Sequence, residues 1–129
     1  MPPHDLATVV ADYVAAWNCA DEADRRALLQ RSFAVDGRYA DPGVRIEGRE
    51  ALVGHARRFA TRCPGAVIEL TSAVDAHGDA ACFTWRVAGP DGGPVHEGID
   101  VVVAGPDGRL QEVRGFFGAY RSPHAARPR

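Results

Sequence analysis

Three oxygen-bearing side chains in this sequence could carry out acid–base chemistry together. Asp100 lies in the stretch HEGIDVVVAG, which reads as a buried strand. An ionised and unpaired carboxylate among valines costs several kcal/mol, so Asp100 must be either paired or protonated. Asp41 begins an Asp-Pro-Gly turn, and Tyr13 lies on an apolar helical stripe. Carboxyl groups and a phenol are side chains that can donate or accept protons in a reaction.

Each of the three residues also has a purely structural explanation. Asp100 could be held by backbone amides or by an arginine such as Arg86 or Arg114, since buried acids are usually paired. Asp41 could cap its own turn. Tyr13 could be a core tyrosine with one satisfied hydroxyl. Only their convergence on one site would favour chemistry over structure.

The first half of the chain predicts three helices. Apolar residues of the segment 6–17 recur with helical spacing, and Asp5 is placed to act as its N-cap. A second helix is expected over 22–33, after which Asp36-Gly37 interrupts the pattern. A third is expected over 49–62, opened by Gly48.

The second half predicts strands. Two short ones, RYAD and VRIEG, flank the Asp-Pro-Gly turn, and four longer runs follow: AVIELTSAV, AACFTWRVA, VHEGIDVVVA and LQEVRGFFGAY. The turn sequences AHGD, GPDGG and GPDG separate the long runs, which indicates an antiparallel meander. We therefore expect an α+β fold in which a curved antiparallel sheet, wrapped by three N-terminal helices, forms a cone. Residues 1–121 would be a single domain and 122–129 a flexible C-terminal tail.

The strand alternation predicts which side chains face the interior of the cone. Asp100 shares a face with His96 and Gly98, while Phe83 and Trp85 share the aromatic face of the preceding strand. These faces should line the interior. The opposite face of the central strand is also apolar, so we expect it to pack against a second copy of the chain.

Composition excludes several classes of function. The chain has 129 residues and a net charge of −2, which argues against binding to nucleic acid or to an anionic membrane. All of its basic residues are arginine, which we interpret as the mark of a GC-rich bacterial genome. The sequence predicts no signal peptide, no membrane span, no metal site and no nucleotide-binding loop. Three widely spaced cysteines indicate reduced, mostly buried thiols and a cytoplasmic protein.

Several segments in order resemble one superfamily. These are YVAAW, FAVDGRYADP, EGREAL, HGDAACFTWRV, EGIDVVVAGPDGRL and EVRGFF, which span most of the chain. In this order and spacing the sequence resembles the nuclear transport factor 2-like superfamily, also described as a cystatin-like α+β barrel. Within it, the SnoaL-like proteins and the ketosteroid isomerases are the most similar.

The resemblance to ketosteroid isomerases implies a role for each of the three residues. Asp41, followed by Pro, matches the general base of that family. Asp100, preceded by Ile, matches the acid that stays protonated and donates to the oxyanion. Tyr13 occupies the place of the second oxyanion donor. The implied enzyme is a cofactor-free isomerase or polyketide cyclase acting alpha to a carbonyl.

The sequence also departs from the isomerases. It lacks their tyrosine on the third helix, and it adds Trp85 and His96 near the site. These differences indicate a carbonyl substrate that is smaller than a steroid or differently shaped. His96 could be a general acid or a histidine bonded to Tyr39 or Asp100. The residues expected to bind substrate are Trp17, Phe33, Tyr39, His55, Phe59, Phe83, Trp85, His96 and Phe117.

Two alternatives to an isomerase or cyclase remain open. One is a non-catalytic protein of the same fold that binds a small apolar ligand. The other is an epoxide hydrolase, which needs an arginine between two aspartates around a water. Strand alternation turns Arg86 away from Trp85, which counts against the hydrolase.

Overall fold

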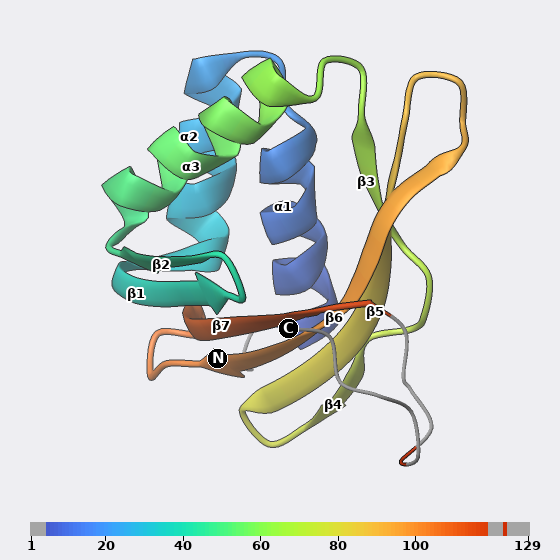
Figure 1. Ribbon diagram of the computed structural model, residues 1–129. Coiled ribbons are helices and arrows are strands. Elements are labelled where there is room, and N and C mark those ends of the chain that lie inside the picture. The colour runs from blue at the N-terminus through green and yellow to red at the C-terminus, as the bar shows by residue number, and fades with distance from the viewer. Residues whose placement is uncertain (1–4, 119–122, 124–129) are drawn as a thin grey trace.

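Three helices gather on one side of a seven-stranded sheet (Figure 1). The computed structural model describes residues 5–118 and residue 123. Along the chain the elements are α1 (Leu6–Asn18), α2 (Glu22–Ser32), β1 (Phe33–Asp41), β2 (Val44–Glu47), α3 (Arg49–Arg62), β3 (Val67–Leu70), β4 (Asp75–His77), β5 (Ala80–Ala88), β6 (Pro94–Ala104) and β7 (Leu110–Phe117). The expected tail, 122–129, lies outside the described residues except for residue 123.

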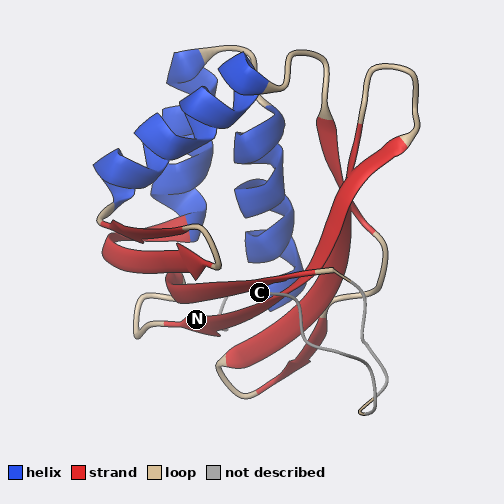
Figure 2. Ribbon diagram, in the orientation of Figure 1, coloured by secondary structure: helices blue, strands red, loops and turns tan. Residues whose placement is uncertain are grey.

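The sheet curves around the helices, as Figure 2 shows. Its strand order is β2-β1-β7-β6-β5-β3, and β4 pairs with β5. Helix α3 packs against β1 and β2, while α1 packs against β3 near the other edge. The expected α+β cone is therefore confirmed. No helix in the described part of the chain is long and apolar enough to cross a membrane.

The expectation of a wholly antiparallel sheet is wrong at one pairing. Strand β1 pairs with β7 in parallel, with Tyr39 opposite Val113. Parallel neighbours need a long connection between them, and here α3 and all of the meander provide it. The remaining strand pairs are antiparallel, as expected.

The helix boundaries follow the sequence closely. Asp5 caps α1 by accepting a hydrogen bond from the Ala7 amide at 3.4 Å, and Asp21 caps α2 by accepting one from Ala23 at 3.3 Å. Gly48 precedes α3 with a φ of 91°, a value that favours glycine. The apolar stripe of α1 is buried, as its spacing predicted.

Two predicted boundaries are wrong. Helix α2 ends at Ser32, and β1 begins at Phe33 without an intervening loop. Gly37 does not interrupt the strand: a Cβ there would lie 2.7 Å from the Phe33 ring, so glycine leaves room for that ring. The run AVIELTSAV forms a strand only over Val67–Leu70, and the Ser72 hydroxyl, just after this strand, accepts a hydrogen bond from the Thr84 amide. Strand β4 begins after the run, at Asp75, and extends into the expected turn AHGD.

The cysteines differ from expectation in burial. Cys19, Cys63 and Cys82 are free thiols. None is fully buried, and Cys82 is exposed because it lies on the outer face of β5. The expectation of mostly buried thiols is therefore wrong.

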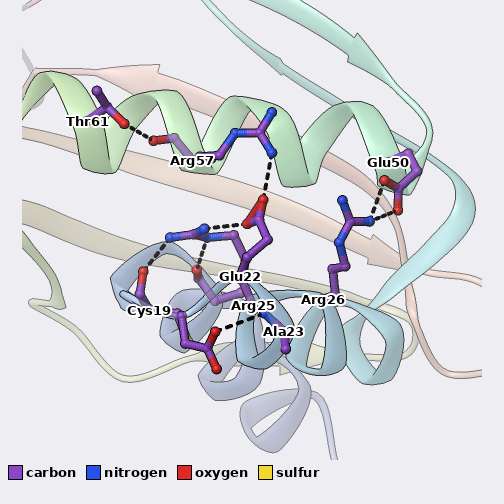
Figure 3. Close-up of polar contacts among 10 residues, drawn as sticks. Cys19, Glu22, Ala23, Arg25, Arg26, Glu50, Arg57 and Thr61 are labelled. Carbon is purple, nitrogen blue, oxygen red and sulfur yellow. Dashed lines mark hydrogen bonds and ion pairs between the residues drawn. The ribbon is translucent and has the colours of Figure 1, made fainter.

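A buried arginine joins the helices (Figure 3). Arg25 of α2 is 2% exposed and donates to the carbonyl oxygens of Ala16 and Cys19 at the end of α1. It also pairs with Glu22 at 2.6 Å, and Glu22 pairs in turn with Arg57 of α3 at 2.6 Å. Carbonyls at the end of a helix lack partners within it, so Arg25 satisfies acceptors that would otherwise be lost on burial.

We predict that Arg25→Met lowers the free energy of unfolding by about 2 kcal/mol, because it leaves buried acceptors without a donor. Arg26→Met is the matched control, since Arg26 lies on the same helix and makes an exposed ion pair with Glu50. It should change stability little. Urea unfolding followed by circular dichroism measures both variants. Equal stability of the two would contradict the role given to Arg25.

Candidate active site

A cavity of about 270 Å³ lies between the helices and the inner face of the sheet. All of the predicted site residues except Phe33 line it: Tyr13, Trp17, Tyr39, Asp41, His55, Phe59, Phe83, Trp85, His96, Asp100 and Phe117. They come from α1, α3 and the strands β1, β5, β6 and β7. Phe33 is completely buried beneath Tyr13, where the two rings stack at 6.4 Å. It therefore supports the cavity wall instead of forming it.

Asp100 is buried without an arginine. It is 8% exposed, and its Oδ1 accepts a hydrogen bond from Trp85 Nε1 at 2.9 Å. The two arginines that could have neutralised it pair elsewhere: Arg86 with Glu69 at 2.9 Å and Arg114 with Glu112 at 3.2 Å. The explanation of Asp100 as half of a structural ion pair is therefore excluded.

Burial raises the pKa of Asp100 from about 3.8 to about 7. Removal from water is the largest cause, because it disfavours the ionised form. The Trp85 hydrogen bond lowers the pKa, and the nearby charge of Asp41 raises it. At or below neutral pH much of the Asp100 population is therefore protonated and can donate a hydrogen bond.

Gly98 explains how Trp85 reaches Asp100. The two residues are paired across β5 and β6, and a Cβ on Gly98 would lie 2.4 Å from the indole ring. The same Cβ would lie 2.2 Å from the Phe116 carbonyl oxygen. Only glycine leaves space for the indole to lie across the strand toward Asp100, two residues along.

Asp41 lies beside Asp100 across the sheet. A Cβ on Gly115 would lie 3.1 Å from Asp100 Oδ1 and 3.4 Å from Asp41 Cβ, so this glycine opens the space between the two acids. Asp41 accepts hydrogen bonds from the Gly43 amide at 2.7 Å and from the Tyr39 hydroxyl at 2.6 Å. Asp41 thus caps its own turn and also lines the cavity.

The Tyr13 hydroxyl is buried in the cavity wall without a partner. Tyr13 is 2% exposed, and its hydroxyl oxygen has no hydrogen-bond partner among the described residues. Burial raises its pKa well above the usual range, Asp100 adds to the shift, and Trp17 partly offsets it. A neutral phenol with an unused donor, in the wall of the cavity that Asp100 also lines, is suited to bind an oxygen of a ligand.

Aromatic rings from α1, α3 and β1 meet in one wall of the cavity. The ring of His55 lies 5.5 Å from that of Trp17 and 5.6 Å from that of Tyr39, and Trp17 also contacts Phe59 at 5.8 Å. Burial lowers the pKa of His55, and the neighbouring Asp41 partly opposes that shift. His55 thus belongs to the aromatic wall.

His96 bonds to neither predicted partner among the described residues. Its ring packs against those of Phe117 at 4.4 Å and Trp85 at 5.6 Å. The Tyr39 hydroxyl donates to Asp41 instead. His96 and Phe117 are both exposed and line the cavity, which places them at its opening.

Several residues of the cavity were not predicted from the sequence. Arg58, Arg62 and Cys63 lie along the end of α3, and the apolar residues Val14, Ile68 and Val87 complete the wall. Helical spacing could have identified the arginines, because residues 58 and 62 share a face with His55 and Phe59. No three His, Cys, Asp or Glu side chains in the described ranges come together to hold a metal ion.

Fold and site together define a cone-shaped α+β protein whose mostly apolar cavity contains two acids in different environments. The chain belongs to the family of SnoaL-like domains, because the model of that domain matches residues 10–121. The resemblance seen in the sequence is thereby confirmed. No curated protein matches the chain significantly.

Solved structures of similar proteins agree with this assignment. A SnoaL-like candidate isomerase from Agrobacterium tumefaciens is 35% identical, with a TM-score of 0.82, over 87% of this chain and 96% of that one. A candidate polyketide cyclase from Sinorhizobium meliloti is 24% identical, with a TM-score of 0.67, over 84% and 93% of the two chains. A Catenulispora acidiphila protein with a ketosteroid isomerase-like fold, solved with trimethylamine, is 19% identical, with a TM-score of 0.67, over 89% and 85%.

We predict that Asp100 makes stability depend on pH. Its pKa of about 7 in the folded protein exceeds its ordinary value near 3.8. Its contribution to stability is therefore fully present below about pH 4, declines as pH rises to 7 and is constant above that. A shift of this size corresponds to about 4 kcal/mol across the window. Asp100→Asn should remove that decline, as urea unfolding at successive pH values will show.

Two further variants make this test specific. Trp85→Phe removes the hydrogen bond that lowers the pKa of Asp100, so the decline should extend above pH 7. Asp36→Asn, an exposed aspartate of β1, should keep the wild-type decline. An unchanged slope in Asp100→Asn would mean that Asp100 is ionised in the folded protein.

Proposed function

We propose that the protein is a cofactor-free enzyme that moves a proton alpha to a carbonyl group, as an isomerase or a cyclase. The observation that carries the proposal is the pair Asp41 and Asp100, which open on one cavity from different environments. Asp100 is held by one indole N–H in an apolar surround, whereas Asp41 accepts two hydrogen bonds beside an exposed turn. Environments that differ in this way favour different protonation states for the two carboxyl groups, so that Asp100 acts as the acid and Asp41 as the base.

In the proposed mechanism, Asp100 and Tyr13 bind the substrate and Asp41 then removes a proton. The substrate carbonyl oxygen accepts hydrogen bonds from protonated Asp100 and from Tyr13. Asp41, as the ionised base, removes a proton from the alpha carbon, and the electron pair of the C–H bond moves to the carbonyl oxygen as an enolate. An isomerase would return the proton to a different carbon. A cyclase would let the enolate carbon attack a second carbonyl of the same molecule, whose oxygen then takes the proton.

Trp85 and Tyr39 position this machinery. The Trp85 indole occupies Asp100 Oδ1, so the acidic proton of Asp100 is carried by its other oxygen. The Tyr39 hydroxyl occupies one oxygen of Asp41, and the Gly43 amide occupies the other. These hydrogen bonds fix both carboxyl groups before a substrate enters, which is the preorganisation that catalysis requires.

The dimensions of the cavity favour a small substrate. Its volume of about 270 Å³ is just below the roughly 300–1,000 Å³ of pockets for drug-sized ligands. Its walls are mostly aromatic and aliphatic. A compact carbonyl compound with an apolar body suits these dimensions.

The alternatives have less support. A binding protein would gain nothing from a buried carboxyl group that lacks an ion-pair partner, because its ionised form costs stability. An epoxide hydrolase would need an arginine between Asp41 and Asp100. Arg86 pairs with Glu69 on the outer face of the sheet, and Gly115 lies between the two acids.

We predict that Asp41→Asn reduces exchange of alpha protons by about 10²–10⁴-fold, the usual contribution of a general base. Proton NMR in deuterated buffer measures the exchange directly on small 1,3-diketones and β,γ-unsaturated ketones, without knowledge of the natural substrate. Asp36→Asn, on the same strand, is the matched control and should exchange at the wild-type rate. The wild-type rate should also fall as pH rises through about 7, where Asp100 ionises. Normal exchange by Asp41→Asn would refute the proposed base.

We also propose that two copies pair through the outer face of the sheet. Val101 is 39% exposed and Phe116 is 56% exposed on that face, next to the half-buried Ile99 and Val103. Burying them against a second copy would remove apolar surface from water. We predict a dimer by sedimentation at micromolar concentration and a monomer for Val101→Glu combined with Phe116→Glu. A monomeric wild-type protein would contradict the proposal.

A further inference from the structure

Two arginines at the cavity were not used by the proposed mechanism. Arg58 and Arg62 lie one turn apart on α3, and both line the cavity while their side chains remain exposed. They therefore lie where the cavity opens to solvent. Neither has a carboxylate partner among the residues that the structure describes.

Their lack of a partner distinguishes them from most other arginines. Eight of the described arginines form ion pairs with acidic side chains: Arg25, Arg26, Arg31, Arg38, Arg57, Arg86, Arg109 and Arg114. Arg57 is adjacent to Arg58 in sequence but points to α2, where it pairs with Glu22. The two arginines that face the cavity are thus left with their charge available to a ligand.

The charge of both arginines reaches the interior of the cavity. Each of them lowers the pKa of His55, whose ring contacts Trp17 and Tyr39 in the wall. The guanidinium of Arg58 folds back along α3: its Nη1 lies 3.4 Å from where a Cβ of Gly54 would be.

The cavity is thus polar at two places and apolar between them. Asp100 and Tyr13 supply hydrogen-bond donors inside, and Arg58 and Arg62 supply positive charge at the opening. Trp17, a buried residue, belongs to the wall between them. A ligand that meets all three regions has a carbonyl at one end, an apolar chain or ring in the middle and an anionic group at the other end.

We propose that the substrate is an anionic carbonyl compound, an oxo acid or oxo phosphate ester, whose anionic group binds Arg58 and Arg62 while its carbonyl binds Asp100 and Tyr13. Guanidinium groups bind carboxylates and phosphates through paired, charge-assisted hydrogen bonds. The inference rests on the proposed function for the carbonyl end, whereas the anionic end depends only on the arginines.

Both tryptophans of the chain line the cavity, so their fluorescence reports ligand binding. The probes are 4-oxopentanoate, 6-oxoheptanoate and 8-oxononanoate, their methyl esters, and 5-oxohexyl phosphate. We expect the best anion to bind at least tenfold more tightly than its neutral ester, with a preference that weakens as salt is added. Comparison of 6-oxoheptanoate with 5-oxohexyl phosphate distinguishes an oxo acid from an oxo phosphate.

Charge-neutralising variants locate the anion site. Arg58→Gln and Arg62→Gln should each weaken anion binding by about tenfold, as expected for the loss of one charge-assisted hydrogen bond, and leave ester binding unchanged. Arg45→Gln removes the same charge from exposed strand β2, outside this cavity, and should have no effect. Arg58→Lys should restore part of the preference.

The outcomes separate this inference from the proposed function. Equal affinity for acid and ester, or an equal loss in Arg45→Gln and Arg58→Gln, would overturn the anion site. Exchange of alpha protons on neutral ketones would then still support the enzyme. A strong anion preference lost in Arg58→Gln, together with no exchange on any oxo acid, would keep the anion site and refute the chemistry.

Discussion

The hydrogen bond from the Trp85 indole to Asp100 is the interaction on which the character of the site depends. Removal from water alone would push Asp100 toward a permanently neutral acid, and an arginine in place of the indole would hold it permanently ionised. A single neutral donor leaves the pKa near 7. The bond exists because Gly98 has no side chain, so the backbone of β6 and the indole of β5 can meet. A glycine therefore determines the electrostatics of a neighbouring carboxyl group.

The sequence predicted the fold and most of the cavity because both depend on periodic patterns. The helical stripe placed Tyr13 and Trp17, and strand alternation placed Trp85 and Asp100 on the inner face. Periodic patterns do not predict which side chain forms a hydrogen bond or an ion pair with a buried acid. Asp100 had arginine candidates in the sequence, and its actual partner is an indole whose reach depends on a glycine two residues away. Phe33 was predicted wrongly for a related reason. An aromatic residue can either line a cavity or lie buried behind the residues that line it, and the sequence does not distinguish these two positions.

The boundaries that sequence reasoning missed share a physical cause. Asp36-Gly37 and the run around Ser72 were judged by local propensity, but tertiary contacts decided both. Gly37 stays in the strand because a large ring needs its space. The parallel pairing of β1 with β7 could not follow from local signals, since these strands are far apart in the chain. This pairing nevertheless puts Asp41 beside Gly115 and hence close to Asp100.

Asp100 and Asp41 lie in parts of the sheet that differ in how easily they open locally. Asp100 lies in β6, between two long antiparallel neighbours, whereas Asp41 ends β1, beside the four-residue edge strand β2. Local opening costs least where a strand has few neighbours. Changes in the edge hairpin therefore move Asp41 more easily than Asp100. Substitutions in a single short hairpin can thus vary the distance between the two carboxyl groups while the centre of the sheet is unchanged.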